Sequence, residues 1–404
     1  MIFPVFIETD KKTTIIHYIA YISTTIKIRR KVMKRKIFLL AASLFTLTAI
    51  SSSLNATEIK ADDPAIKYEG VLYREKRNDE GIEYRRFLIP LLKKGLPKFK
   101  LAKFEKGQVK SLTTPCIKMF FKTDAKSVTA HFKMLKGATD RGSNFALYRN
   151  GKFWKEARFS KSKTYPKDLE IELTPEKGAK ETLYQISFPS WSNPFFYGLT
   201  TDGDSKLIPF ELPKKKIYVA YGDSVSHGTG QKSAAYLTWP YKLAEKINYE
   251  VYSLAIGGAK INRNLFPMFK EFKHIDLITV YIGINDAGAK TLKEYGDDYN
   301  ALLDAIRASH PETKIVCISM HTLPKDKKGK KDGTPLREYG EVAKEIVKKR
   351  VAAGDKKLML VDGTELVGLE DAMNPGNVHL SIAGADKWAK NLYKKIEGFV
   401  SKCY

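Results

Sequence analysis

The chain has 404 residues, a length that suggests two domains once any targeting segment is set aside. Apolar residues make up 43% and aromatic residues 11% of the sequence, which predicts packed cores and excludes a largely disordered chain. The formal net charge is +25, but the lysines are spread along the chain and the aromatic residues form no nucleic-acid-binding motif, so nucleic acid is not expected as a partner.

Residues 1–56 are expected to be a targeting region. The basic residues 34–36 precede the apolar run from Ile37 to Ile50, and small residues follow up to Ala56, which is the pattern of a signal peptide. The run is shorter than the roughly 20 residues that a helix needs to cross a bilayer, and no later stretch is long and apolar enough. We therefore expect export to the periplasm or the extracellular space, with an uncleaved N-terminal anchor as the alternative.

Met33 directly precedes the basic residues, so residues 1–32 are interpreted as an unused upstream segment. The region 1–56 holds nine Lys/Arg and two Asp/Glu, and removing it leaves a net charge of about +18. Such a charge attracts anionic polymers. We interpret it as solvated surface, and a face that binds a polyanion, such as an anionic polysaccharide, is the alternative.

The three cysteines, Cys116, Cys317 and Cys403, are scattered. They form neither a disulfide framework nor the paired spacing of a zinc site. Cys317 lies in an apolar run and is expected to be a buried small hydrophobic residue. No metal and no cofactor is predicted.

Residues 57–211 show short β-type runs separated by Gly, Asp, Lys and Pro. The runs are 116–123, 127–134, 145–149 and 169–173. Many short strands with polar turns predict a β-sandwich or jelly roll. A mixed α+β domain is the alternative.

A Lys- and Pro-rich stretch, 212–216, marks the start of a second domain that is expected to span residues 212–404. Apolar strands alternate there with helical segments. The expected strands are 217–221, 251–256, 277–282, 314–320 and 358–361, and the expected helices are 234–247, 262–272, 299–309, 335–353 and 382–399. This alternation predicts a doubly wound, flavodoxin-like parallel sheet of five strands with helices on both faces. Ligands of such sheets bind beyond the carboxyl ends of the strands.

Four polar or glycine-containing segments follow these strands. Ser224 lies in the sequence Gly-Asp-Ser after the first strand, where a tight turn into a helix exposes a hydroxyl beside backbone N–H groups. Gly257 and Gly258 follow the second strand, Asn285 follows the third, and His379 lies after the fifth strand and before the last helix. Together they supply a nucleophile, oxyanion donors and a base, which are the groups that acyl transfer needs.

The order Gly-Asp-Ser, loop glycine, Gly-x-Asn-Asp and late Val-His resembles the four sequence blocks of the SGNH (GDSL-like) hydrolase family. The resemblance implies that Ser224 is the nucleophile and His379 the general base. It also implies an oxyanion hole formed by the N–H groups of Ser224 and Gly258 and the side chain of Asn285, with Gly257 as the alternate for Gly258.

Upstream segments are similar to the β-domain that precedes the hydrolase domain in some bacterial carbohydrate-type SGNH esterases. These segments are Arg86-Phe87-Leu88-Ile89-Pro90, Gly142 to Tyr148 and Ser187 to Trp191. The resemblance implies an exported serine esterase that removes acetyl or another small acyl group from a carbohydrate. A lipase or thioesterase with the same catalytic residues, and a carbohydrate-binding protein with a decayed site, are the alternatives.

The sequence departs from the family at one position. The family usually has aspartate three residues before the histidine, and this chain has Gly376 there. We favour a Ser-His dyad in which a backbone carbonyl orients His379, and the alternative is that Asp371 supplies the acid from across the following loop. Asp223 is expected to be a structural part of its own turn, and His227 is the alternative base.

Overall fold

The structure is a computed structural model, and it describes residues 56–77, 81–87, 110–135, 141–160, 164, 166–324 and 327–401. The expected signal peptide therefore lies outside the described residues, apart from Ala56. Residues 88–90 of the upstream motif and Cys403 also lie outside them. In the described part of the chain, no helix is long and apolar enough to cross a membrane.

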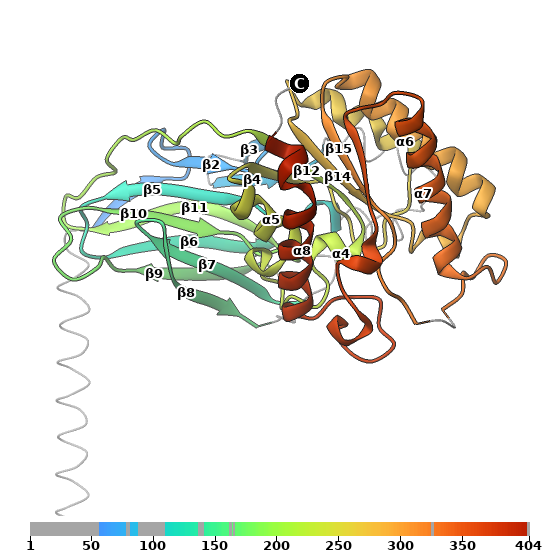
Figure 1. Cartoon of the computed structure of the whole chain (residues 1–404). Coiled ribbons are helices and arrows are strands. Elements are labelled where there is room, and N and C mark those ends of the chain that lie inside the picture. Colours follow the sequence, from blue (N-terminus) through green and yellow to red (C-terminus); the bar gives the residue numbers. More distant parts are fainter. Residues whose placement is uncertain are drawn as a thin grey trace, which may run out of the picture. The chain divides into compact units, whose positions relative to one another are not determined.

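Two antiparallel sheets make up the first part of the described chain and form a sandwich (Figure 1). One sheet has the order β3-β4-β11-β6-β9, with β1 paired to β11, and the other has the order β2-β5-β10-β7-β8. The strands are β1 (Ala56–Lys60), β2 (Lys67–Glu69), β3 (Tyr73–Arg77), β4 (Gly81–Arg85), β5 (Lys118–Thr123), β6 (Val128–Leu135), β7 (Ser143–Arg149), β8 (Lys152–Phe159), β9 (Lys167–Leu173), β10 (Thr182–Ser187) and β11 (Asn193–Asp202).

The sandwich forms because its strands alternate apolar and polar residues. In β9, Leu169, Ile171 and Leu173 are buried while the charged residues between them are exposed, which is the period of two that a strand with one buried face requires. The inward side chains of both sheets meet in one aromatic-rich core that includes Phe132, Phe145 and Phe188. The β-sandwich expected from the short β-type runs is confirmed.

A parallel sheet of five strands follows, with the order β13-β12-β14-β15-β16. Its strands are β12 (Ile217–Gly222), β13 (Glu250–Ser253), β14 (Leu277–Tyr281), β15 (Lys314–Ile318) and β16 (Leu358–Val361). All neighbouring pairs are parallel. The order of the strands reverses at β12, so the carboxyl ends of β12, β13 and β14 surround the switch point where doubly wound sheets bind ligands.

Helices cover both faces of this sheet. They are α4 (Ser224–His227), α5 (Trp239–Ile247), α6 (Leu292–Ser309), α7 (Leu336–Ala352) and α8 (Ile382–Ser401), with 3₁₀ turns η1 (Ala235–Leu237), η2 (Arg263–Glu271), η3 (Asp286–Gly288), η4 (Gly363–Glu365) and η5 (Leu369–Asp371). Figure 1 shows α5 and α8 on one side of the sheet and α6 and α7 on the other. The predicted doubly wound domain is confirmed.

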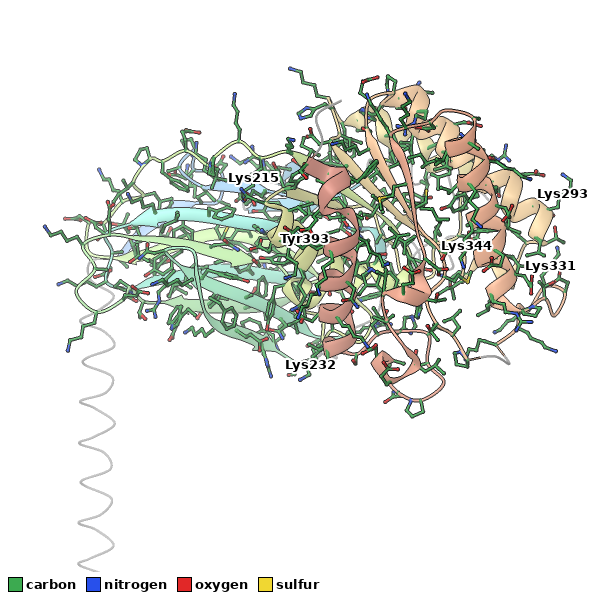
Figure 2. The ribbon with its side chains drawn as sticks, in the orientation of Figure 1. Lys215, Lys232, Lys293, Lys331, Lys344 and Tyr393 are labelled. Carbon is green, nitrogen blue, oxygen red and sulfur yellow. The ribbon has the colours of Figure 1, made fainter. Side chains whose placement is uncertain are left out.

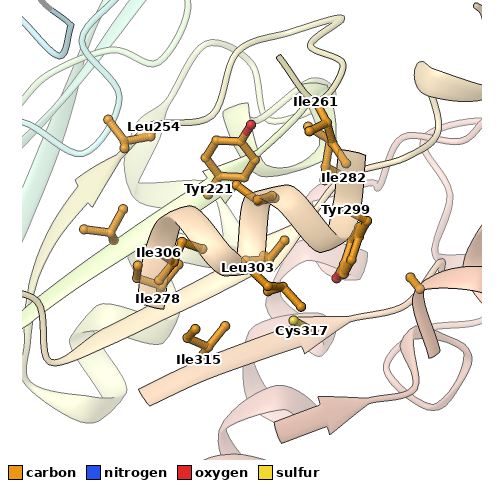
Figure 3. Packing of buried hydrophobic residues seen from close by; sticks show 14 of the residues in the cluster. Tyr221, Leu254, Ile261, Ile278, Ile282, Tyr299, Leu303, Ile306, Ile315 and Cys317 are labelled. Carbon is orange, nitrogen blue, oxygen red and sulfur yellow. The ribbon is translucent and has the colours of Figure 1, made fainter. Parts of the chain in front are cut away.

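The apolar strands of the parallel sheet contribute side chains to two separate hydrophobic cores, one on each face of the sheet. Ile278 and Ile315 point toward Leu303 and Ile306 of α6, and Cys317 lies buried beside them (Figure 3). The strand residues that alternate with these, such as Leu277 and Val316, face the other side of the sheet and pack against α5 and α8. Because both faces are buried, these strands read as continuous apolar runs rather than alternating ones.

Two helices differ from the sequence-based expectation. The segment expected as a helix over 262–272 is the 3₁₀ turn η2, which contains Pro267; proline lacks the N–H that an α-helix interior needs. The helix expected to begin at Tyr299 begins earlier, at Leu292. Thr291 and Glu294 form a capping box there, in which each side chain accepts the backbone N–H of the other residue.

Candidate active site

The turn after β12 presents Ser224 as the first residue of the short helix α4. Asp223 is the N-cap, and its carboxylate accepts the N–H of Val225 at 2.9 Å. Gly222 is required because a Cβ there would collide with the Ser226 hydroxyl and with the Tyr281 carbonyl of β14. The result is a sharp strand-to-helix turn with the Ser224 side chain at the carboxyl edge of the sheet.

His379 lies in the loop before α8, and its imidazole reaches the serine. The distance from His379 Nε2 to Ser224 Oγ is 2.8 Å, which lies within the range expected for a nucleophile and its general base. The two residues are 155 positions apart in the chain. The structure therefore brings together the two side chains that the sequence motifs singled out.

The other ring nitrogen of His379, Nδ1, contacts neither a backbone carbonyl nor Asp371, the two groups that were expected to orient the imidazole. His379 Nδ1 lies 2.9 Å from Oδ1 of Asn377, and the same oxygen accepts the backbone N–H of His379 at 2.9 Å. The expectation of a main-chain carbonyl was therefore wrong, because an asparagine two residues earlier folds back onto this short loop as its side chains commonly do.

The alternative, that Asp371 supplies the acid, is also wrong. Its carboxylate accepts the N–H of Gly368 at 2.8 Å and pairs with Lys387 Nζ at 2.7 Å. Gly368 lies at the start of η5 and Lys387 lies on α8, so both of these interactions hold the carboxylate away from the imidazole. Asp371 has no hydrogen bond to His379.

The two neighbouring loop glycines after β13 have different roles. The N–H of Gly257 donates to Nδ1 of His227 at 3.0 Å, so it is not available to a substrate. Gly258 has a φ of +82° and is exposed, and its N–H has no hydrogen-bond partner among the described residues. This difference favours Gly258 over the alternate, Gly257, as the oxyanion donor.

Asn285 follows β14 and faces the serine turn. Its Nδ2 lies 3.4 Å from Oδ2 of Asp223, and its side chain makes no hydrogen bond that caps η3. Asn285 therefore occupies the N-cap position of η3 without using its side chain as a cap. The amide remains available as a donor at the edge where Ser224 and Gly258 lie.

His227, the alternative base, is buried and has both ring nitrogens engaged. Its Nε2 lies 2.8 Å from the Ser190 carbonyl and 2.8 Å from Thr113 Oγ1, while its Nδ1 accepts from Gly257. Burial, with the charge of Arg86 as the next cause, holds the pKa of His227 well below its usual range. His227 is thus a neutral ring that supports the glycine loop.

Burial also changes the pKa values of two residues at the site. It lowers the pKa of His379 to about 4, with the positive charge of Arg141 as the second cause. The imidazole is therefore neutral and able to accept a proton at neutral pH. Burial raises the pKa of Asp223 to about 7 against the opposing effect of the Val225 N–H, which agrees with a structural role for Asp223 in its own turn.

Part of this chain matches a known protein family. Residues 220–387 match the model of the GDSL-like Lipase/Acylhydrolase family. This part of the chain is a GDSL-like (SGNH) hydrolase domain. The match begins in β12 and ends in α8, so the SGNH domain contains Ser224, Asn285 and His379. A search of curated proteins found no match to the chain.

Solved structures share the complete arrangement of β-sandwich and SGNH domain at low identity. A salicylyl-acyltransferase from a tetracycline biosynthetic pathway has a TM-score of 0.72 at 16% identity, covering 86% of this chain and 98% of its own. A family two carbohydrate esterase from Clostridium thermocellum in complex with cellohexaose has a TM-score of 0.61 at 14% identity, covering 83% of this chain and 99% of its own. An acetyl xylan esterase from Butyrivibrio proteoclasticus has a TM-score of 0.58 at 13%, covering 86% and 99%. These identities show the fold alone.

Sequence reasoning did not assign a site role to Arg86, which ties the β-sandwich to the SGNH domain. Its buried guanidinium donates to the carbonyls of Ser253 and Ala255, each at 2.7 Å, and to that of Thr113, also at 2.7 Å. Ser253 and Ala255 directly precede the glycine loop, so Arg86 fixes the strand end from which that loop leaves. An arginine beside the apolar residue Phe87 was a weak signal of this role.

Proposed function

We propose that this protein is a serine esterase that removes acetyl or another small acyl group from a carbohydrate. The observation that carries the proposal is the 2.8 Å contact between Ser224 Oγ and His379 Nε2. The N–H of Gly258, which has no partner among the residues that the structure describes, and the side-chain amide of Asn285 lie at the same sheet edge. A nucleophile, a neutral base and two donors are the set required for acyl transfer.

In the proposed reaction, His379 Nε2 takes the proton of the Ser224 hydroxyl as Oγ attacks the ester carbonyl carbon. The N–H groups of Ser224 and Gly258 and the Asn285 amide donate to the oxyanion of the tetrahedral intermediate. The C–O bond to the sugar then breaks, and His379 gives its proton to the leaving oxygen. Water, deprotonated by His379, attacks the acyl-enzyme; the bond between the acyl carbon and Ser224 Oγ breaks, His379 returns the proton to Oγ, and the carboxylic acid leaves.

Asn377 takes the place of the acid in this scheme. Its Oδ1 accepts the Nδ1–H of His379, which leaves Nε2 as the acceptor that faces Ser224. A neutral amide stabilises the imidazolium less than a carboxylate does.

The choice of substrate is supported by the carbohydrate esterases that share both domains, and by the expected export of the chain. A lipase or thioesterase would use the same residues but would need a long apolar acyl groove. A binding protein with a decayed site would have no reason to keep a serine and an imidazole at hydrogen-bonding distance. We also propose that the chain is exported, which sequencing of the N-terminus of the mature protein would test.

The experiment is an acyl-chain and substrate comparison on the purified mature protein. Hydrolysis of nitrophenyl acetate is compared with that of a long-chain nitrophenyl ester, and acetate release is measured from acetylated polysaccharides. The proposal predicts a strong preference for acetyl and acetate release that Ser224→Ala abolishes. Preference for the long chain would favour the lipase alternative, and binding of glycans without any turnover would favour the decayed site.

A further inference from the structure

Two cationic side chains from the β-sandwich region lie beside the proposed Ser224 site. Arg141, just before β7, has an exposed side chain whose Nη1 donates to Thr229 Oγ1 at 3.2 Å. The N–H of Thr229 in turn donates to the carbonyl of Ser224 at 3.0 Å. The guanidinium is therefore attached to the turn that carries the nucleophile.

Trp191 holds this guanidinium in a fixed place. The Arg141 guanidinium carbon lies 3.9 Å from the centroid of the Trp191 ring, and the opposing stack of Trp191 on His227 also has a centroid distance of 3.9 Å. Trp191 is buried, and a Cβ on Gly257 would collide with it. Arg141 thus rests on a rigid platform that adjoins the oxyanion loop.

Lys110 brings a second positive charge to the same loop. Its Nζ lies 3.6 Å from the position that a Cβ on Gly258 would occupy. The charges of Arg141 and Lys110 both contribute to the lowered pKa of His227, and Arg141 contributes to that of His379. Both cations are therefore close enough to act on groups around the serine.

Arg141 differs from many basic residues of this chain because no carboxylate neutralises it in the described part of the structure. Lys215, Lys293 and Lys344, labelled in Figure 2, each pair with a carboxylate within 2.9 Å. The hydrogen bond of Arg141 goes to a neutral hydroxyl, which leaves most of its five N–H donors for a ligand. Within the described residues Arg141 therefore has no opposite charge beside it, and an anionic group of a ligand can supply one.

We propose that Arg141, with Lys110 beside it, binds an oxoanionic group of the substrate next to the ester that Ser224 attacks. The inference rests on the proposed function and narrows its substrate to an acylated acidic glycan. The oxoanion is a sugar carboxylate or a sugar sulfate, because guanidinium binds both through paired N–H···O hydrogen bonds. The site lies at the ester itself, so it differs from a general attraction by the net charge.

The test is the ratio of kcat/KM on acetylated polygalacturonate to kcat/KM on acetylated glucomannan, a neutral polymer. The wild type should prefer the acidic polymer, and Arg141→Met should lower the ratio by roughly ten- to a hundredfold, the range for hydrogen bonds to charged groups. Arg141→Lys should recover part of the loss, and Lys110→Gln should lower the ratio as a second, independent variant. Inhibition by short oligogalacturonates or by sulfated oligosaccharides then distinguishes the two oxoanions.

Lys293→Gln is the matched control, because it removes one positive charge from the exposed start of α6. It should leave the ratio unchanged. An equal loss in Lys293→Gln and Arg141→Met would mean that only bulk charge acts, and a wild-type ratio near one would also overturn the inference while leaving the esterase function intact. Failure to hydrolyse either polymer or nitrophenyl acetate would instead contradict the proposed function.

Discussion

Asn377→Ala tests how His379 is held. Oδ1 of Asn377 accepts two hydrogen bonds from His379, both at 2.9 Å. Each hydrogen bond contributes about 0.5–1.5 kcal/mol net, so their loss removes about 1–3 kcal/mol from the ordering of the imidazole. Since about 1.4 kcal/mol corresponds to a tenfold change in rate, kcat/KM should fall roughly 5- to 150-fold.

The assay is kcat/KM for nitrophenyl acetate as a function of pH, with the melting temperature measured for each variant. Asn377→Asp keeps an acceptor at this position and should retain most of the activity. Its carboxylate should raise the pKa of His379, so the acid limb of the profile should move to higher pH. This shift separates orientation of the base from a purely structural role of the loop.

Asp371→Asn is the control, because the Asp371 carboxylate bonds to Gly368 and Lys387 rather than to His379. The folded variant should keep kcat/KM within a few-fold of the wild type. Wild-type activity in Asn377→Ala would show that Asn377 does not orient the imidazole. A loss of several orders of magnitude in Asp371→Asn, as removal of a triad carboxylate causes, would show that Asp371 does.

Three further outcomes are expected. His379→Ala should nearly abolish turnover with little change in melting temperature, whereas His227→Ala should lower the melting temperature because it leaves the buried Gly257 N–H without its acceptor; calorimetry and turnover would show a wrong choice of base if the effects were reversed. Asn285→Ala should lower kcat by roughly a hundred- to a thousandfold with little change in KM, and a change in KM alone would reassign the amide to ground-state binding. Because the pKa of His379 is lowered from 6.5 to about 4, the base stays neutral as the pH falls from 7, and kcat/KM should decline only near pH 4; an acid limb near 6.5 would contradict this.

The fold was largely predictable because the pattern of apolar residues along each strand depends on which of its faces are buried. Strands β12 and β14 are buried on both faces and read as unbroken apolar runs, while β9 alternates apolar and charged residues. The boundaries were less predictable, because they depend on local details. Pro267 turns an expected α-helix into a 3₁₀ segment, and the Thr291 cap extends another helix toward its N-terminus.

The site was predictable only in part. Ser224, Gly258, Asn285 and His379 follow strand ends of one sheet, and a sheet of known order brings such positions together. The position of Asn377 Oδ1 depends on one side-chain rotamer in a short loop, which no sequence spacing specifies.

The contributions of the β-sandwich to the site were not predictable either. Arg141, Trp191 and Arg86 reach the site through contacts with residues far away in the chain. Neither periodicity nor motif spacing indicates such contacts.

The most direct test of the central claim is to find which residue carries the acyl group. The purified protein is treated with a serine-directed phosphonate ester, and the modified peptide is identified by mass spectrometry while esterase activity is followed. We expect one adduct, on Ser224, that forms as activity is lost and that is absent from Ser224→Ala, which should itself lose on the order of a million-fold in kcat. An adduct on another residue, or turnover that survives in Ser224→Ala, would show that Ser224 is not the nucleophile.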